Sequence, residues 1–228
     1  MKNVLLKPVS FQLRLLKPLL VFVLLIPGIF LKSQESSTRS TAVYPVFGLG
    51  FGFFSPGDVN KYIEASLPSG YVNEMGSEDI FMFLDLHAGL TFRMKRFDIT
   101  AMAEYDIAPK FIMITNGDDL SFNFSRFAPG ILANLYVPVG SGKHAFFLGG
   151  GVNYSIMNFE KFSASAPGFR FQLGFSLQFG KFNLQPFGAF NYASATDDSD
   201  EDLENFDMDY TNGQIGVNLS FHPAINYK

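Results

Sequence analysis

Hydrophobic side chains recur at every second position along much of the chain. In the segment from Phe169 to Phe179, Phe or Leu occupies every odd position, and Arg, Gln, Gly or Ser occupies every even position. A period of two places the two sets on opposite faces of a β-strand, whereas a helix would mix them around its circumference. The pattern therefore predicts a strand with one apolar and one polar face.

The same alternation predicts seven further strands. It is clear in residues 43–54, 81–94, 97–107 and 214–221, and weaker in residues 122–137, 144–156 and 182–192. An even number of antiparallel strands allows a sheet to close on itself, which removes exposed edges. The sequence therefore predicts an all-β fold, an eight-stranded antiparallel up-and-down transmembrane β-barrel.

The predicted connections alternate in length. Long or medium loops are expected at about residues 55–79, 108–121, 158–167 and 194–212, with a helical turn near Val59–Ala65. Tight turns are expected at Lys95-Arg96, residues 139–143 and Gly180-Lys181, where a leading Gly suits the positive φ of a type II′ turn. Long loops on one rim and tight turns on the other are typical of outer-membrane barrels.

Alternation alone does not tell which face points outward, so a soluble lipocalin-like cup with an apolar interior is the alternative. The polar faces hold mainly Gly, Ser, Thr, Asn and Gln with few charges. A water-facing sheet would carry frequent Lys and Glu, and glycines suit the narrow interior of a small barrel. We therefore expect the odd residues of 169–179 to contact lipid and the even residues to line a polar lumen.

The first 33 residues differ from the rest of the chain. Basic residues precede an apolar run at residues 19–31, and no acidic residue occurs there. This composition predicts a secretory signal peptide, cleaved near Ser33, with a retained membrane anchor as the alternative. The expected organisation is a signal peptide (1–33), a polar lead (34–42), the barrel (43–222) and a short tail (223–228).

Charge and cysteine content exclude several classes of function. The chain has no Cys, so neither disulfides, thiolate metal sites nor a thiol nucleophile is available. Without residues 1–33, 12 basic side chains stand against 21 acidic ones, a net charge of about −9. An acidic chain of this kind is not expected to bind nucleic acid.

With these features the chain resembles the small eight-stranded outer-membrane barrels that include the OmpA membrane domain, OmpX and OmpW. The resemblance covers residues 43–221 and rests on the alternating segments, the unequal loops and the closing strand GQIGVNLSF. That strand ends in Phe221, similar to the terminal aromatic through which the outer-membrane assembly machinery recognises such proteins, although HPAINYK follows it here. The resemblance implies a monomer in the lipid of a cell outer membrane, with a protein or ligand contact at the extracellular loops. The tail is too short for the peptidoglycan-binding domain of OmpA-type proteins.

Charged residues at the predicted inward positions form the candidate site. They are Asp85, His87, Arg93, Glu104, Asp106, Arg126 and Arg170. One interpretation is a packed network of ion pairs in a polar core, and the other is a narrow conduit or gate. Asp85 and His87 could be a base and its orienting group, but no nucleophile is predicted at their level. We therefore expect no enzyme activity and no cofactor.

Two loops are weighed as further sites. Asp198, Asp200, Asp202 and Asp209 resemble the start of a calcium loop, but Leu203 replaces the required Gly. A solvated acidic loop with no metal is therefore expected. The first long loop carries apolar and aromatic side chains and is the better candidate for a partner contact. These side chains are Tyr62, Ile63, Leu67, Tyr71 and Val72.

The sequence thus predicts a non-enzymatic outer-membrane protein with a structural, adhesion or envelope-complex scaffolding role. The alternative is a narrow channel or an OmpW-like transporter of small apolar molecules.

Overall fold

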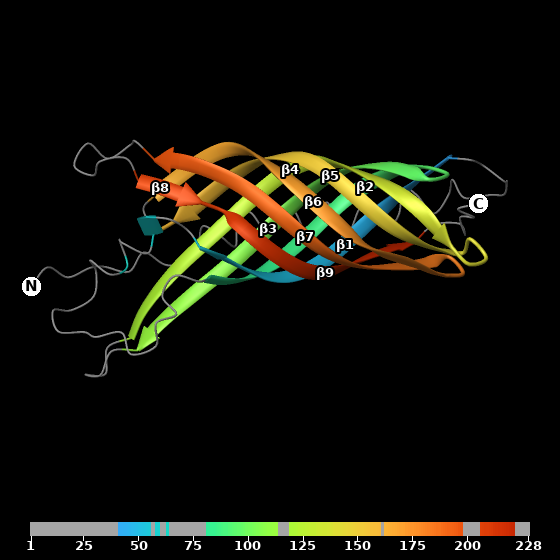
Figure 1. Cartoon of the computed structure of the whole chain (residues 1–228). Coiled ribbons are helices and arrows are strands. Elements are labelled where there is room, and N and C mark those ends of the chain that lie inside the picture. Colours follow the sequence, from blue (N-terminus) through green and yellow to red (C-terminus); the bar gives the residue numbers. More distant parts are fainter. Residues whose placement is uncertain are drawn as a thin grey trace, which may run out of the picture. The chain divides into compact units, whose positions relative to one another are not determined.

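The computed structural model describes residues 41–55, 58–59, 63, 81–113, 119–160, 162–197 and 206–221 (Figure 1). These residues form nine strand segments. They are β1 (Thr41–Ser55), β2 (Phe81–Met94), β3 (Phe97–Met113), β4 (Asp119–Val139), β5 (His144–Phe159), β6 (Phe162–Phe179), β7 (Phe182–Asp197), β8 (Phe206–Asp209) and β9 (Thr211–Phe221). Only Tyr210 separates β8 from β9, and its backbone exchanges two hydrogen bonds with Ala193 of β7. The pair β8 and β9 is therefore one interrupted strand, the eighth of the sheet.

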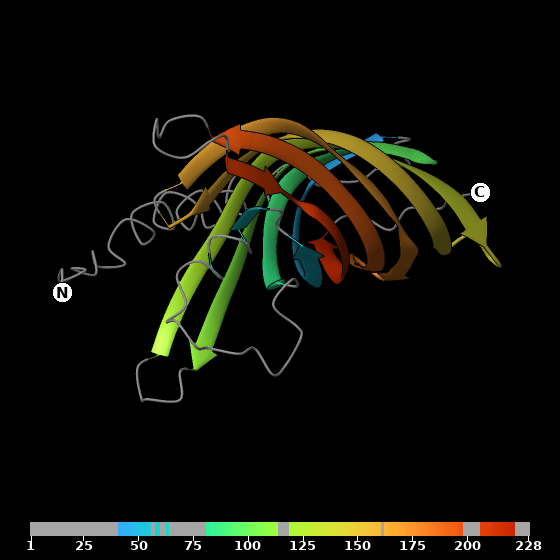
Figure 2. The ribbon, with the colours of Figure 1, turned by 60° about the vertical axis from the view of Figure 1, so that its left-hand side comes forward.

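Each strand pairs antiparallel with its neighbours in the sequence, and the sheet closes where β1 pairs with β9. Going round the wall, β6 then pairs with β7 and β7 with β9. The strands wrap round one another with a strong tilt (Figures 1 and 2). The predicted all-β, eight-stranded, antiparallel barrel is confirmed. Among the described residues, no helix has the length and apolar character needed to cross a membrane.

The alternation of faces follows the prediction. In β6, buried and exposed residues alternate from Phe162 to Gln178, with only Leu177 intermediate in exposure, and Arg170 is buried between the exposed Phe169 and Phe171. Along the wall the exposed side chains at this level are Phe, Leu, Ile, Val and Met, whereas the buried ones include Asp, Glu, Arg, Asn and Gln. Polar side chains therefore face the lumen, and apolar side chains face outward.

Three predicted loops are shorter than expected. Strands β3 and β4 extend through much of residues 108–121, and β7 and β8 pair within residues 194–212. The predicted loop at 158–167 is wrong, because Phe159 of β5 pairs with Phe162 of β6 across a two-residue turn. In residues 163–166, Ser and Ala alternate, whereas Gln and Phe alternate further along the strand. The difference in hydrophobicity between the two faces is therefore too small for the sequence to indicate a strand.

The geometry at Gly180 agrees with the predicted turn, whereas the predicted helical turn is described only in part. Gly180 has a φ of 63°, and Lys181 is not among the described residues with positive φ, as a type II′ turn requires. Of the predicted helical turn at 59–65, the structure describes Val59 and Ile63, both helical, and the remainder lies outside the described residues. The predicted signal peptide (1–33), the polar lead up to residue 40, the last residue of the predicted barrel (222) and the predicted tail (223–228) also lie outside them.

At the end that carries the long loops, the polarity of the two faces is exchanged. Here the inward residues form an apolar cluster that includes Phe54, Phe81, Phe124 and Tyr210, with Val59 and Ile63 of the first loop. The outward residues at this level of β4 to β9 are polar and exposed. They are Asn123, Asn158, Ser163, Ser165, Ser194, Thr196, Asp207 and Thr211. We call this part the loop-end extension. It is built like a soluble β-barrel, which the sequence analysis did not anticipate.

Candidate functional site

The candidate charged residues meet inside the barrel at the level of the apolar outer belt. Asp85 and His87 lie on β2, and the β2–β3 register sets them directly opposite Asp106 and Glu104 of β3. Arg126 of β4 lies opposite Asp106 in turn. All of them are buried, so the closed sheet gathers ions from neighbouring strands into one water-poor interior.

Arg126 is the centre of this charged cluster. Its Nη2 donates to Oε2 of Glu104 at 2.9 Å, its Nη1 donates to Oδ2 of Asp106, and its Nε donates to Oγ of Ser155 at 3.0 Å. The hydroxyl of Tyr210 also donates to Oδ2 of Asp106, at 2.6 Å, and the guanidinium carbon lies 4.2 Å from the centre of the Tyr210 ring. Two carboxylates and an aromatic face therefore hold one guanidinium, a geometry that stabilises a buried cation.

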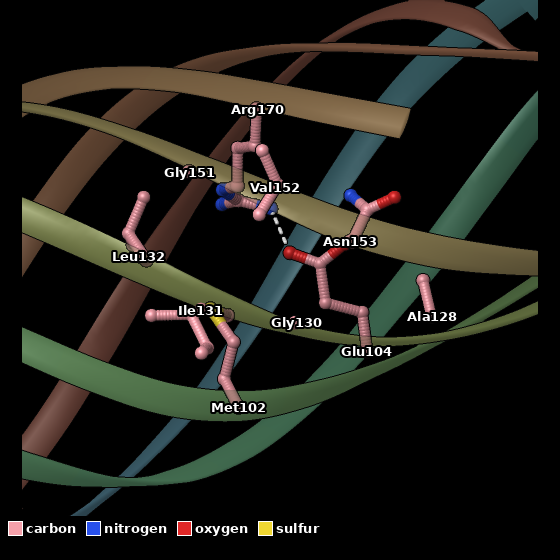
Figure 3. Close-up of a pocket in the computed structure, with 10 residues that line it drawn as sticks. All are labelled: Met102, Glu104, Ala128, Gly130, Ile131, Leu132, Gly151, Val152, Asn153 and Arg170. Atoms are coloured by element: carbon pink, nitrogen blue, oxygen red, sulfur yellow. Dashed lines mark hydrogen bonds and ion pairs between the residues drawn. The ribbon is translucent and has the colours of Figure 1, made fainter. Parts of the chain in front are cut away.

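Glu104 joins this cluster to a second arginine (Figure 3). Its Oε1 accepts a hydrogen bond from Nη1 of Arg170, while Nε of Arg170 donates to Oε1 of Gln172 at 3.3 Å. Gln172 in turn donates to Oδ1 of Asn134 at 2.9 Å. A single carboxylate of β3 thus bridges arginines of β4 and β6 across the lumen.

His87 has an oxygen partner at each ring nitrogen. Nδ1 lies 2.7 Å from Oδ2 of Asp85, and Nε2 lies 2.5 Å from Oδ1 of Asn218. Gly48 of β1 lies opposite His87, and a Cβ at Gly48 would collide with the imidazole and with Asn218. Both ring nitrogens therefore have an oxygen partner, and these contacts fix the orientation of the ring.

Arg93 belongs to a second group nearer the tight turns, which Asn134 links to the charged cluster. Its Nη1 donates to Oδ2 of Asp98 at 3.1 Å, and its guanidinium lies 3.3 Å from the centre of the Tyr136 ring. The Tyr136 hydroxyl and Nδ2 of Asn134 donate to the two oxygens of Asp98 at 2.7 and 2.8 Å. Asp98 directly faces Arg93 across the tight turn. This pairing could have been found from the sequence, because both residues lie at inward positions next to that turn.

Other members of the two groups were also missed. Asn218, Ser155 and Gln172 lie at inward positions but carry no charge, so nothing in the sequence distinguished them from other polar lumen residues. Tyr136 was missed because aromatics were expected outside, although it has inward parity on the predicted strand 122–137. Tyr210 was missed because it lies in the predicted loop 194–212.

The cavities beside these clusters are small. One, of about 10 Å³, lies between β4 and β5 next to Gly130, Gly151, Glu104 and Arg170 (Figure 3). Another, of about 20 Å³, lies between the charged cluster and the Arg93 group. Each has room for about one water molecule. Neither of these two cavities is large enough for a solute.

The loop candidates are only partly described. Asp198, Asp200 and Asp202 lie outside the described residues, and Asp209 accepts a hydrogen bond from Ser194 at 2.5 Å. Within the described part of the chain, no three His, Asp or Glu side chains are placed to hold a metal ion. Of the first-loop residues, Ile63 is buried in the apolar cluster of the extension, and Tyr62, Leu67, Tyr71 and Val72 are not described.

This fold is that of the small eight-stranded outer-membrane barrels, which confirms the fold implied by the resemblance. Among solved structures, the chain is similar to Neisserial surface protein A (NspA), with a TM-score of 0.56 and 9% identity over 81% of this chain and 99% of that one. It also matches Ail, the attachment invasion locus protein of Yersinia pestis, in complex with sucrose octasulfate and without it. These matches have TM-scores of 0.38 and 0.35 and identities of 8% and 9%, and each covers 81% of this chain and all of that one. No family model and no curated protein matches the sequence.

Proposed function

We propose that the protein is an integral barrel of a bacterial outer membrane, sealed by its packed lumen, that presents the loop-end extension for adhesion or for scaffolding an envelope complex. The observation that carries this proposal is the inverted polarity of the wall. Val152 and Ile215 are 67% and 69% exposed, while Arg93 and Arg126 are each 1% exposed. In water this arrangement would expose apolar surface and bury ions, whereas in lipid both placements are favourable.

The height of the apolar belt matches a bilayer. On β6 the outward residues from Phe169 to Phe179 are all apolar, and Ser163 and Ser165 follow above them. Ten residue steps at 3.4 Å each, tilted by 45°, span about 24 Å, close to the roughly 25 Å apolar band of outer-membrane barrels. Below the belt, the tight turns carry Lys95, Lys143 and Lys181, which suit the phosphates of lipid head groups.

The packed lumen favours a structural role over transport. Ion pairs and aromatic rings occupy the axis at the described levels, and the interior cavities of about 10 and 20 Å³ are too small for a solute. The soluble-cup alternative requires apolar side chains inside at the level of the charged cluster, where Glu104, Arg126 and Arg170 lie instead.

Two measurements test this proposal. The protein from an outer-membrane fraction should migrate differently in unheated and boiled gel samples, and proteoliposomes should show no solute flux above lipid-only vesicles. Recovery in the soluble periplasmic fraction with no heat shift would contradict membrane integration. Flux of a small apolar solute would support the transport alternative instead.

The partner-binding role needs a separate experiment. The chain has no Cys, so a cysteine placed at Asn158 in the extension can carry a unique photo-crosslinker, with Lys181→Cys at the opposite rim as the control. We expect adducts with an envelope or host component from Asn158→Cys only. Equal adducts from both positions, or none, would contradict partner binding through the extension.

A further inference from the structure

An apolar groove lies on the outer wall, away from the charged lumen. It has a volume of about 550 Å³ and crosses the outward faces of β6, β7, β9 and β1. Its sides are formed by Phe51, Phe53, Phe171 and Phe190, with Leu148, Leu173 and Ile215 beside them. The volume falls within the roughly 300–1,000 Å³ of small-molecule sites.

Two glycines make the hollow. Gly188 lies between Leu173 and Ile215 in one row of outward residues, and Gly213 lies between Phe190 and Phe53 in the next row. The two rows are neighbours, because Gly188 and Phe190 face Ile215 and Gly213 of β9. Two missing side chains at diagonal positions therefore leave one continuous gap in a wall that is otherwise covered by large apolar groups.

Steric crowding does not explain these glycines. A Cβ at Gly48 or Gly174 would collide with neighbouring atoms, so glycine is required there, but a Cβ at Gly188 or Gly213 would meet nothing within 4 Å. Glycine weakens the interior of a strand, and where it is not needed for packing it often marks the close approach of another molecule. Gly188 and Gly213 thus lower the stability of their strands, and their missing side chains leave the groove open.

Polar groups occur at only one end of the groove. One row toward the loops, Tyr192 follows Phe190 by two residues and Thr211 precedes Gly213 by two, a rise of about 6–7 Å along each strand. Both are exposed, and the Tyr192 ring stacks on Phe169 with centroids 5.1 Å apart. The surface is thus apolar within the belt and carries hydroxyl groups at its upper boundary, the polarity of a lipid with its chain in the belt and its ester groups above.

We propose that this groove binds one acyl chain of a lipid from the leaflet on the long-loop side, with the hydroxyls of Tyr192 and Thr211 facing its ester or head group. The inference rests on the proposed membrane integration, because the groove is continuous with the apolar belt. The described lining carries no charge, and its two glutamines, Gln172 and Gln214, donate hydrogen bonds to Asn134 and Asp85 inside the barrel. A hydrocarbon chain fits this lining, because it needs no ionic or hydrogen-bond partner there.

The test is native mass spectrometry of the full-length protein in detergent, with dipalmitoyl phosphatidylethanolamine as the probe. The wild type should retain one lipid molecule. Gly188→Leu and, independently, Gly213→Leu fill the groove and should lower the retained fraction about tenfold, which corresponds to about 1.4 kcal/mol. Ala101→Leu is the matched control, because Ala101 also faces outward, on β3, and does not line the groove. It should bind as the wild type does.

Several outcomes would overturn the proposal. One is that the wild type retains no lipid, and another is that the wild type and both groove variants retain lipid equally. A third is that the protein forms a dimer through this face. The heat-dependent gel shift is measured on every sample, so a failure of membrane integration is seen separately. A wild type that shifts on heating but binds no lipid removes the groove proposal alone. If the leucine variants do not fold, the double variant Gly188→Ala with Gly213→Ala replaces them, because a Cβ at either position meets nothing within 4 Å, and it should also retain less lipid than the wild type.

Discussion

Arg126 of β4 donates a hydrogen bond to Glu104 of the neighbouring strand β3 at 2.9 Å, although the two residues are not directly opposed in the sheet. Glu104 lies opposite Ala128, and Arg126 lies opposite Asp106. The long guanidinium side chain therefore reaches diagonally and holds two carboxylates of one strand. This contact ties β3 to β4 through the interior in addition to their backbone ladder.

The first prediction concerns this guanidinium. Arg126→Met should destabilise the barrel by about 3–5 kcal/mol, because it removes the cation that the buried Asp106 and Glu104 share and leaves Glu104 with Arg170 alone. Urea unfolding in detergent micelles, followed by the gel shift, measures the change. Lys181→Met in an exposed turn is the control and should cost less than about 1 kcal/mol. Equal midpoints for the two variants would show that the cluster does not contribute to stability.

The second prediction tests the depth of the apolar belt. Leu173 lies at the middle of the outward row of β6, and Ser163 lies above its upper end. Leu173→Arg should cost roughly 2–4 kcal/mol in lipid vesicles, whereas Ser163→Arg should cost about 0–1 kcal/mol, because the penalty for a charge falls toward the interface. Both costs are measured as changes in the free energy of unfolding in vesicles of the same lipid composition. The reverse order would place the belt elsewhere on the wall.

The third prediction compares a glycine beside lumen side chains with a glycine on the outer wall, where a Cβ has free space. Gly48→Ala should destabilise the barrel by about 1–3 kcal/mol, because its Cβ would press on His87 and Asn218. Gly188→Ala should be neutral or stabilising by up to about 1 kcal/mol, because its Cβ meets open space. Thermal unfolding of the two variants in the same detergent decides, and a neutral Gly48→Ala would contradict the close contact.

The fourth prediction separates the loop-end extension from the belt. Phe124 is 1% exposed in the apolar cluster of the extension, and Phe127 on the same strand is 36% exposed on the outer wall. Phe124→Ala should cost about 3–5 kcal/mol and open the extension to protease. Phe127→Ala should change the unfolding free energy in lipid far less. Protease resistance equal to wild type after Phe124→Ala would show that the cluster does not hold the extension together.

The sequence was sufficient for the eight strands at the level of the apolar belt and for the inward face of the charged candidates. A period of two is a direct consequence of strand geometry, so Asp85, Glu104, Arg126 and Arg170 could be placed inside without knowing their partners. Their pairing could not be predicted, because it depends on the stagger between strands and on diagonal reach, as between Arg126 and Glu104. The pairing of Asp98 with Arg93 was the exception, because the tight turn between them fixes which residues of β2 and β3 face each other.

The extension was missed for a different physical reason. On β6 its outward and inward residues are Ser and Ala, a pair with little difference in hydrophobicity. Phe53 and Phe54 are adjacent, yet one faces outward and the other packs in the apolar cluster. Only the closed sheet shows that the inward aromatics of β1, β2, β4 and β5 lie at one level.

The exchange of polarity along the barrel also bears on how the strands find their partners during assembly. In a uniformly alternating sheet, a slip by one residue turns every side chain to the wrong face, but a slip by two residues restores the alternation. Here a slip of β6 by four or six residues would move Arg170 from Glu104 toward the level of Phe124 and Phe159. A register slip by four or six residues therefore also costs free energy. The residues that distinguish the inward from the outward face thus also fix how the strands are aligned along the barrel axis.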